Sequence, residues 1–277
     1  MNKSFSARVL GFYGVMFFLF IYLPIGLIFV YSFNSNPINM MVWDGFTFDW
    51  YRTIFGFSAE VTEATLYVES TDQLINAVQN SLLVASVAAV VSTLLGTIAA
   101  LALYRFRVRF QGFYRGLMMT PMMMPDIVLG IALLIFFVSV GIDLGVTTIM
   151  IGHCTFLISY VFIIVSARLA GMDPALEEAS ADLGAPPLTT FRRVTLPRIL
   201  PGVMGGMMLA FIISMDDLVI TYFISGVDAT TLPVFILSMI RRGVKPEINA
   251  IASMLLMFSI VVASLGIYLR ARSEKRL

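Results

Sequence analysis

The sequence predicts an all-α membrane protein, and three observations carry that prediction. Hydrophobic residues make up 59% of the chain, whereas a soluble domain is apolar over about half of its residues. The mean hydropathy is +0.91 and only 13% of the residues are charged. The apolar residues also gather into runs of the ~20 residues that a helix needs to cross a bilayer. A soluble globular domain is therefore excluded.

Six such runs can be marked in the chain. They cover approximately residues 9–33, 82–104, 117–140, 144–167, 199–224 and 248–269. The first run is longer than the roughly 7–15 apolar residues of a secretory signal and has no small-x-small cleavage site, so we expect it to remain as a helix. In the fifth run, Gly202, Gly205 and Gly206 include a G-x-x-x-G step, which allows close helix packing. We expect one transmembrane domain, 1–277, because no length remains for a second one.

The orientation of these helices follows from the cations, because Lys and Arg are retained on the cytoplasmic side of a membrane. With the N-terminus inside, the cytoplasmic segments hold most of the 18 cations: Lys3, Arg8, Arg105, Arg107, Arg109, Arg115, Arg168, Arg192, Arg193, Arg198, Arg270, Arg272, Lys275 and Arg276. The outer loop 34–79 instead carries acids: Asp44, Asp49, Glu60, Glu63, Glu69 and Asp72. Both termini are therefore expected in the cytoplasm, and the net charge of +1 offers no basic patch for nucleic acid.

Metal and nucleotide chemistry find little support in the sequence. The chain has no G-x-x-x-x-G-K-[ST] loop, so any ATP that drives it must bind to another subunit. His153 and the single cysteine, Cys154, lie side by side in an apolar run, but a metal site needs three or four converging ligands. The methionines around residues 118–124 are thioethers that bind Cu(I), yet Met is also an ordinary filler of apolar contacts. We predict no catalytic residues, metal or cofactor, and we interpret these side chains as packing.

A polar segment, 168–198, interrupts the apolar pattern between the fourth and fifth runs. Asp173-Pro174 punctuates its start, and residues 176–183 fit one short amphipathic helix. Gly184 is placed to end that helix ahead of Pro186-Pro187. A helix held outside the bilayer in this way is a surface for a partner protein.

The spacing within this segment resembles a known signature. Glu178-Ala179-Ser180 is followed after three residues by Gly184, and then after nine residues by Val194-Thr195-Leu196-Pro197. This is similar to the Glu-Ala-Ala, three residues, Gly, nine residues, Ile-x-Leu-Pro motif of the permease subunits of bacterial ABC importers, with Ser180 and Val194 as small departures. The resemblance implies the type I importer permease architecture and a location in the bacterial inner membrane. It also implies that Glu178, Ala179, Gly184, Leu196 and Pro197 couple the permease to a cytoplasmic ATPase.

Three acids lie inside the apolar runs, where a charge costs at least ~2.5 kcal/mol and is usually functional. Asp126 follows Pro125 near the middle of the third run, and Pro121 and Pro125 are expected to kink or break that helix. Asp216 and Asp217 lie in the fifth run and diverge by about 100° around a helix, so one can face a pathway while the other packs. No Lys or Arg lies in these runs to neutralise the acids, which favours a cationic substrate; structural acids paired with helix backbones are the alternative.

The regions around these acids narrow the resemblance. Residues 124–128, 214–219, 231–233 and 243–250 look like the second permease subunit of spermidine/putrescine ABC importers, and the likeness is weakest over 56–73 in the outer loop. It implies a heterodimer of two similar permeases, two cytoplasmic ATPase subunits and a periplasmic substrate-binding protein.

Other functions are compatible with parts of the sequence. A permease for a different organic cation or a zwitterion would share every motif described above. A stand-alone ion-coupled transporter or channel would also place acids in the membrane, but it would need no loop for an ATPase. An intramembrane aspartyl protease would use a pair such as Asp126 and Asp217, but the chain has no G-x-G-D motif.

Overall fold

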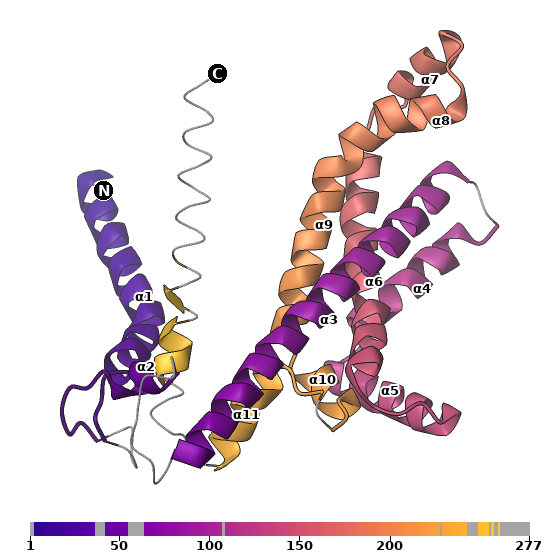
Figure 1. Cartoon of the computed structure of the whole chain (residues 1–277). Helices are drawn as coiled ribbons and strands as arrows, with labels where there is room; N and C mark the ends of the chain where they lie inside the picture. The colour runs from indigo at the N-terminus through magenta and orange to yellow at the C-terminus, as the bar shows by residue number, and fades with distance from the viewer. Residues whose placement is uncertain are drawn as a thin grey trace. The chain divides into compact units, whose positions relative to one another are not determined.

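Helices dominate the computed structural model of the chain (Figure 1). The structure describes residues 3–36, 42–54, 64–106, 109–227, 229–242, 249–254, 256–257 and 260. The chain divides into two compact units, one formed by Met1–Thr71 with Ile236–Leu277 and the other by Asp72–Phe235. We call them the terminal unit and the central unit.

The terminal unit begins with α1 (Lys3–Tyr31), whose segment Val9–Tyr31 is long and apolar enough to cross a membrane. After α1 the chain turns around Asn34, which is fully buried. The Asn34 amide donates to the Val42 carbonyl at 2.7 Å, and its side-chain oxygen accepts the Asp44 N–H at 3.1 Å. Trp50, in the short helix α2 (Asp49–Ile54), donates its indole N–H to the Asn34 carbonyl at 2.7 Å. One asparagine thus closes the turn that leads to α2.

The central unit holds the remaining helices and both predicted functional regions. Its elements are α3 (Ala64–Arg105, which enters the unit at Asp72), α4 (Gln111–Met123), α5 (Asp126–Val140), α6 (Val146–Ala170), α7 (Ala175–Asp182), α8 (Pro187–Thr190), the π-helix η1 (Phe191–Thr195), α9 (Leu196–Asp216), α10 (Val219–Ile224) and the start of α11 (Leu232–Arg242).

Helix α6 is the centre of this unit, and it packs against α4, α9 and α10. Glycines allow the neighbouring helices to approach it. A Cβ added at Gly96 of α3 would lie 2.9 Å from the Ile158 carbonyl oxygen and from the Val161 side chain, and one added at Gly206 of α9 would lie 3.4 Å from Val161. Gly202, four residues before Gly206, faces Arg168 in the same way. The G-x-x-x-G step therefore lies against α6, whereas Gly205 faces open space.

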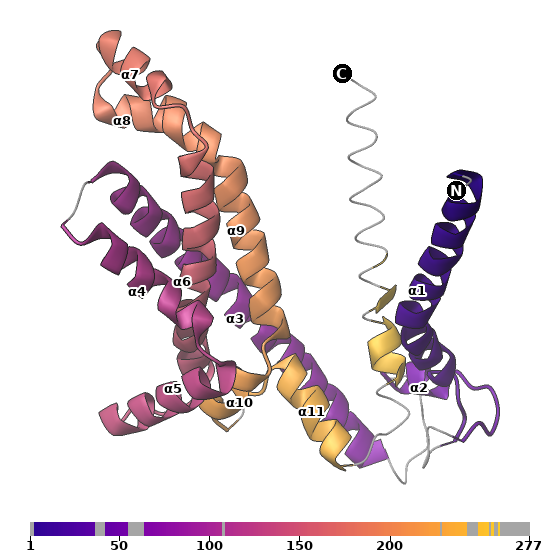
Figure 2. The same cartoon turned by 180° about the vertical axis from the view of Figure 1, so that it is seen from behind.

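Two of the predicted spans are broken inside the apolar sequence. The third predicted run, 117–140, forms α4 and α5, which are bent by 99° at Met124-Pro125 (Figure 2). The break follows from Pro125, which has no N–H to donate and disfavours helical backbone at Met124. The fifth run, 199–224, was expected as one helix, but α9 ends at Asp216 and α10 starts at Val219. The Asp217 backbone is extended, with φ −67° and ψ 120°.

In the described part of the chain, four helices are long and apolar enough to cross a membrane, and the number is five if α4 and α5 form one bent span. The predicted sixth run, 248–269, lies mostly outside the described residues. The segment 34–79, expected as an outer loop, contains α2 and the first part of α3. Polar residues at the start of α3 continue its helix beyond the apolar segment, which is why hydropathy placed the helix start too late.

We predict that Gly96→Ala destabilises the purified subunit by about 1–3 kcal/mol, the usual cost of overpacking, because the new methyl group meets the α6 backbone. Gly205→Ala is the matched control, since it gains the same helix propensity in open space. Thermal unfolding in detergent compares the two variants. Equal midpoints would contradict the close contact between α3 and α6.

Candidate functional site

Both helix breaks of the central unit face one cavity of about 300 Å³. The first break contributes Asp126, and the second contributes Asp216 and Asp217. The remaining lining is aromatic or apolar: Pro121, Met122, Phe156, Tyr160, Ile212, Ile213, Leu218 and Val219. The three acids singled out in the sequence therefore share one cavity, although Asp126 lies far from the other two in the chain.

Asp126 and Asp216 are both exposed. Asp126 lies at the N-terminus of one helix and Asp216 at the C-terminus of another. Asp126 opens α5, where the partial positive charge of the helix N-terminus stabilises a carboxylate. Asp216 closes α9, where unpaired carbonyls add partial negative charge to that of the side chain. The Asp216 end of the cavity therefore attracts a cation through both the carboxylate and the helix terminus.

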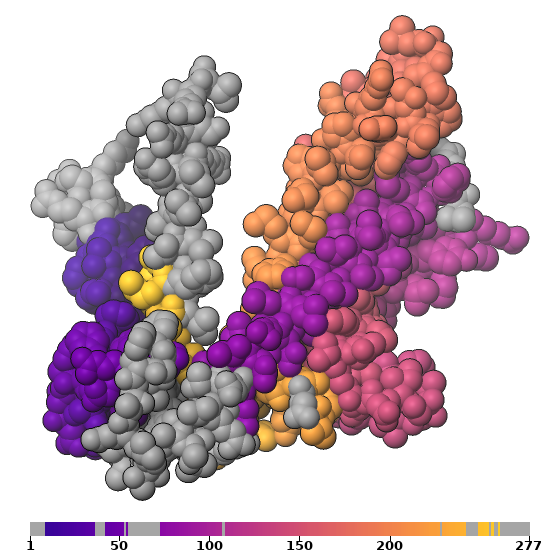
Figure 3. Space-filling view, in the orientation of Figure 1, coloured from indigo at the N-terminus to yellow at the C-terminus, as the bar shows by residue number. Residues whose placement is uncertain are grey.

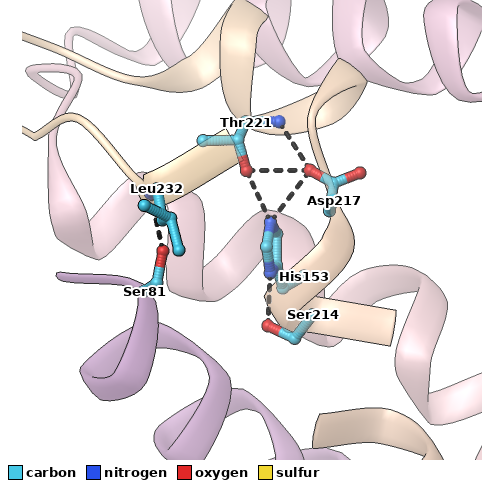
Figure 4. Close-up of polar contacts among 6 residues, drawn as sticks. All are labelled: Ser81, His153, Ser214, Asp217, Thr221 and Leu232. Atoms are coloured by element: carbon cyan, nitrogen blue, oxygen red, sulfur yellow. Dashed lines mark hydrogen bonds and ion pairs between the residues drawn. The ribbon is translucent and has the colours of Figure 1, made fainter. Parts of the chain in front are cut away.

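Asp217 has protein partners. Its Oδ2 atom accepts hydrogen bonds of 2.8 Å from both the backbone N–H and the hydroxyl of Thr221, in α10. The same atom lies 3.2 Å from Nε2 of His153, which is fully buried in α6 (Figure 4). On the other side of the imidazole ring, Nδ1 lies 2.6 Å from the Ser214 hydroxyl of α9. His153 is thus part of a polar network, rather than the apolar packing residue that the sequence analysis expected.

Aromatic side chains give the cavity a second way to hold a cation. Phe156 and Tyr160 lie one turn apart on α6, and both line the cavity. An aromatic face attracts an ammonium group by about 0.5–2 kcal/mol, with the larger value in dry sites. Alkyl chains also pack well on such rings, so the cavity suits an organic cation better than a bare metal ion. No group of three or more His, Cys, Asp or Glu side chains in the described residues could hold a metal.

The predicted partner-binding helix is α7, at one end of the α6–α9 pair (Figures 1 and 2). It ends in a Schellman motif, in which the Ala185 N–H donates to the Ser180 carbonyl at 3.1 Å and the Gly184 N–H to the Ala181 carbonyl at 2.8 Å. Gly184 has φ +76°, a left-handed backbone that glycine adopts without strain. At the other end of α7, the Asp173 carboxylate accepts the Ala175 N–H at 3.0 Å.

A three-residue cluster fixes α7 to the membrane helices. Arg105, the last residue of α3, donates to Glu177 Oε1 at 3.0 Å and to the Thr195 hydroxyl at 3.3 Å. The Thr195 hydroxyl in turn donates to Glu177. Thr195 is fully buried and immediately precedes the Leu196-Pro197 pair that opens α9. The side of α7 that carries Glu177 is therefore anchored to both α3 and α9.

The side of the segment that faces away from α3 and α9 is exposed (Figure 3). Glu178, Ala179 and Gly184 are exposed, and Leu183 and Leu188 are 88% and 77% exposed. The five residues predicted to couple to an ATPase thus divide between this open surface and the start of α9, where Leu196 and Pro197 lie. Leu196 and Pro197 are at the opposite end of α9 from Asp216. The structure therefore contains two separate candidate regions, which α9 joins.

Comparisons with known proteins agree with this arrangement. Residues 92–277 match the model of the family "Binding-protein-dependent transport system inner membrane component". The chain belongs to this family. The ABC importer permease and the inner-membrane location predicted from the sequence are thereby confirmed. As a member of a transport-component family the chain is not an enzyme, and the ATP is bound by a partner ATPase.

Individual relatives cover most of the chain. The putrescine transport system permease protein PotI of Escherichia coli K12 is 40% identical over 94% of this chain and 89% of its own length. The spermidine/putrescine transport system permease protein PotC of the same strain is 39% identical over 88% of this chain and 87% of its own length. A solved bacterial ABC transporter that imports the polysaccharide alginate superposes with a TM-score of 0.65 at 17% identity, over 99% of this chain and 96% of that one. This last likeness shows the importer permease fold alone.

Several residues that organise these regions were not predicted from the sequence. His153, Ser214 and Thr221 surround Asp217, and Arg105 and Glu177 anchor α7. One signal was available, because His153 is the only histidine of the chain and a polar side chain inside an apolar run needs hydrogen-bond partners. Glu177 gives no such signal, since only the fold shows which of two adjacent glutamates points inward.

We expect Gly184→Ala to loosen α7, because a left-handed backbone costs a residue with a Cβ about 1–2 kcal/mol. No atom lies within 4 Å of the added Cβ, so the effect is purely conformational. Gly171→Ala, at the C-terminus of α6 with negative φ, is the control. Hydrogen exchange of the α7 amides should accelerate roughly tenfold in the first variant and stay unchanged in the second. Equal protection in both would rule out the Gly184 cap as the structural support of α7.

Proposed function

We propose that this chain forms half of the translocation pathway of an ATP-driven importer for polyamines, with spermidine and putrescine as the substrates. The main support is the cavity, which is lined by three acids and two aromatic residues: Asp126, Asp216, Asp217, Phe156 and Tyr160. A polyamine consists of ammonium groups joined by short alkyl spacers, so carboxylates and aromatic faces are complementary to its two parts. The names of the relatives PotI and PotC agree with this chemistry.

The proposed architecture is six membrane-spanning helices in one domain, 1–277, with both termini in the cytoplasm. Support comes from the cations at one end of the central unit, where Arg105 lies beside α7 and Arg168 Nε donates to the Arg198 carbonyl at 3.0 Å. Lys and Arg collect on the cytoplasmic side, which supports a cytoplasmic position for α7. The cavity then lies further across the membrane, at the far end of α9.

Energy would reach the cavity through α7. The proposed complex contains a second, similar permease, two cytoplasmic ATPase subunits and a periplasmic binding protein. The exposed leucines 183 and 188, together with Glu178, form the docking surface for an ATPase. When the ATPases close, α7 moves, and Glu177 and Thr195 pass that movement to α3 and α9. The cavity opens alternately to the two sides of the membrane.

The substrate proposal predicts a charge-specific loss of transport. Asp126→Asn and Asp216→Asn keep the side-chain shape but remove the charge, so each should lower the maximal rate of spermidine uptake by about 10–30 fold, equivalent to ~1.5–2 kcal/mol of transition-state stabilisation. The assay uses vesicles that contain the complete complex and external binding protein. The apparent affinity should change less, because the binding protein sets the affinity for delivery.

Asp143→Asn is the matched control, because Asp143 is an exposed acid in the α5–α6 connection, outside the cavity lining. This variant should transport at the parental rate. Parental rates in the Asp126 and Asp216 variants as well would remove the physical basis of the polyamine assignment. If a zwitterion, and not putrescine, competed with spermidine for uptake, the substrate class would have to be changed. The importer function would remain.

Two adjacent glutamates give a test of the coupling. Glu178→Arg reverses an exposed charge, so it should weaken co-purification of the ATPase while α7 keeps its hydrogen-exchange protection. Glu177→Gln removes the ion pair with Arg105 at 3.0 Å, so it should reduce protection of α7 and lower transport per ATP hydrolysed. The reverse pattern would show that Glu177, and not Glu178, faces the ATPase.

A further inference from the structure

Helix α9 ends at Asp216 without a proline or glycine at the break, and a buried imidazole lies beside it. We propose that His153 is a positioning residue for transport, which holds Asp217 so that one carboxylate oxygen faces the cavity. The proposal rests on the proposed function, since it gives Asp217 a defined role in the pathway.

The hydrogen bonds settle which atoms of His153 donate. The Thr221 hydroxyl has one proton, and it donates that proton to Asp217 Oδ2 at 2.8 Å. Nε2 of His153 lies 2.9 Å from the Thr221 hydroxyl oxygen and 3.2 Å from Asp217 Oδ2, and both of these atoms accept. Nε2 therefore carries a proton. In a neutral ring Nδ1 is then an acceptor, and the Ser214 hydroxyl donates to it at 2.6 Å.

These contacts immobilise one half of the Asp217 carboxylate. Oδ2 accepts from the Thr221 N–H, the Thr221 hydroxyl and His153. The other oxygen points away from these partners (Figure 4), and it has no hydrogen bond within the described part of the chain. Asp217 also lines the cavity. The side chain is thus fixed on its protein side and open on its cavity side.

The far end of α10 is fixed to the same helix. The Thr148 hydroxyl of α6 lies 2.9 Å from the Ile224 carbonyl and 2.7 Å from the Gly145 carbonyl, and these two acceptors share its proton. A Cβ added at Gly226 would lie 1.9 Å from the Leu144 carbonyl oxygen, so the chain after α10 passes directly against the start of α6. With His153 near its first turn and Thr148 at its last residue, α10 is held against α6 at both ends. The direction of the Asp217 carboxylate is therefore set by α6.

Two substitutions of His153 test its contact with Asp217 separately from its contact with Ser214. The Gln amide nitrogen reaches about as far as the His Nε2 atom, whereas the shorter Asn side chain ends near the Nδ1 position. His153→Gln therefore keeps a donor for Asp217, and His153→Asn keeps only a partner for Ser214. In vesicles containing the complete complex, we expect His153→Gln to retain spermidine uptake within about threefold of the parent and His153→Asn to lose about tenfold. If His153 served only to fill space, the two variants would lose uptake equally, and that result would overturn the proposal.

A second comparison tests whether the effect passes through Asp217. His153→Asn should cost little further uptake in an Asp217→Asn background, because the carboxylate that it positions is already absent. The same tenfold loss in both backgrounds would overturn the proposal. If neither His153 variant accumulates in the membrane, Ser214→Ala takes their place, since the Ser214 hydroxyl contacts the imidazole that holds Asp217 and, among the described contacts, does not touch the Asp217 carboxylate itself. Parental uptake by Ser214→Ala would then count against the positioning role.

Failure of this proposal and failure of the proposed function give different results. Parental uptake by Asp126→Asn and Asp216→Asn removes the proposed function, whatever His153 does, whereas parental uptake by Asp217→Asn alone overturns only the positioning role of His153. If Asp217→Asn reduces uptake while His153→Gln and His153→Asn lose uptake equally, Asp217 remains part of the pathway. Only the positioning role of His153 is then overturned.

Discussion

Hydrocarbon offers no hydrogen-bond partners, so a membrane helix can break only where the protein or a water-filled cavity satisfies the freed backbone groups. The central unit meets this constraint at two places that share one cavity. At the first break Pro125 has no N–H to satisfy. At the second, the Asp217 carboxylate accepts the Thr221 N–H in the first turn of α10. The cavity and its acids exist because both breaks are supported from within the protein.

The packing of α9 on α6 joins this cavity to the segment 168–198 that contains α7. Helix α9 contains 21 residues, which corresponds to about 30 Å at 1.5 Å per residue. Gly206 and Gly202 bring it close to α6 along this length. A movement at Leu196-Pro197 is therefore carried to Asp216 by one helix, without a flexible connection between them. The anchoring of Glu177 to both Arg105 and Thr195 adds α3 to the same moving body.

Much of this arrangement could be predicted because it depends on residues close together in the chain. Pro125 predicted the break after α4, and Asp173-Pro174 together with Gly184 predicted the short helix between them. The end of α9 at Asp216 was not predicted, because its support combines the local contact of Asp217 with Thr221 and contacts with His153, which is 61 to 68 residues away from its partners in the sequence. The same applies to the pair of Arg105 and Glu177, which are 72 residues apart. Hydropathy and spacing report local preference, whereas these contacts depend on tertiary packing.

The distribution of charge around the cavity explains how a transporter can both attract and release a cation. Asp217 keeps its charge, but His153 and Thr221 hold its Oδ2 atom by hydrogen bonds, so the direction of its other oxygen is fixed. Asp126 and Asp216 are exposed, and the lining contains no Lys or Arg to neutralise them. An exposed carboxylate holds an ammonium group less tightly than a fully buried ion pair would. A pathway needs binding that favours entry yet permits exit, and two exposed acids beside one fixed acid are compatible with both requirements.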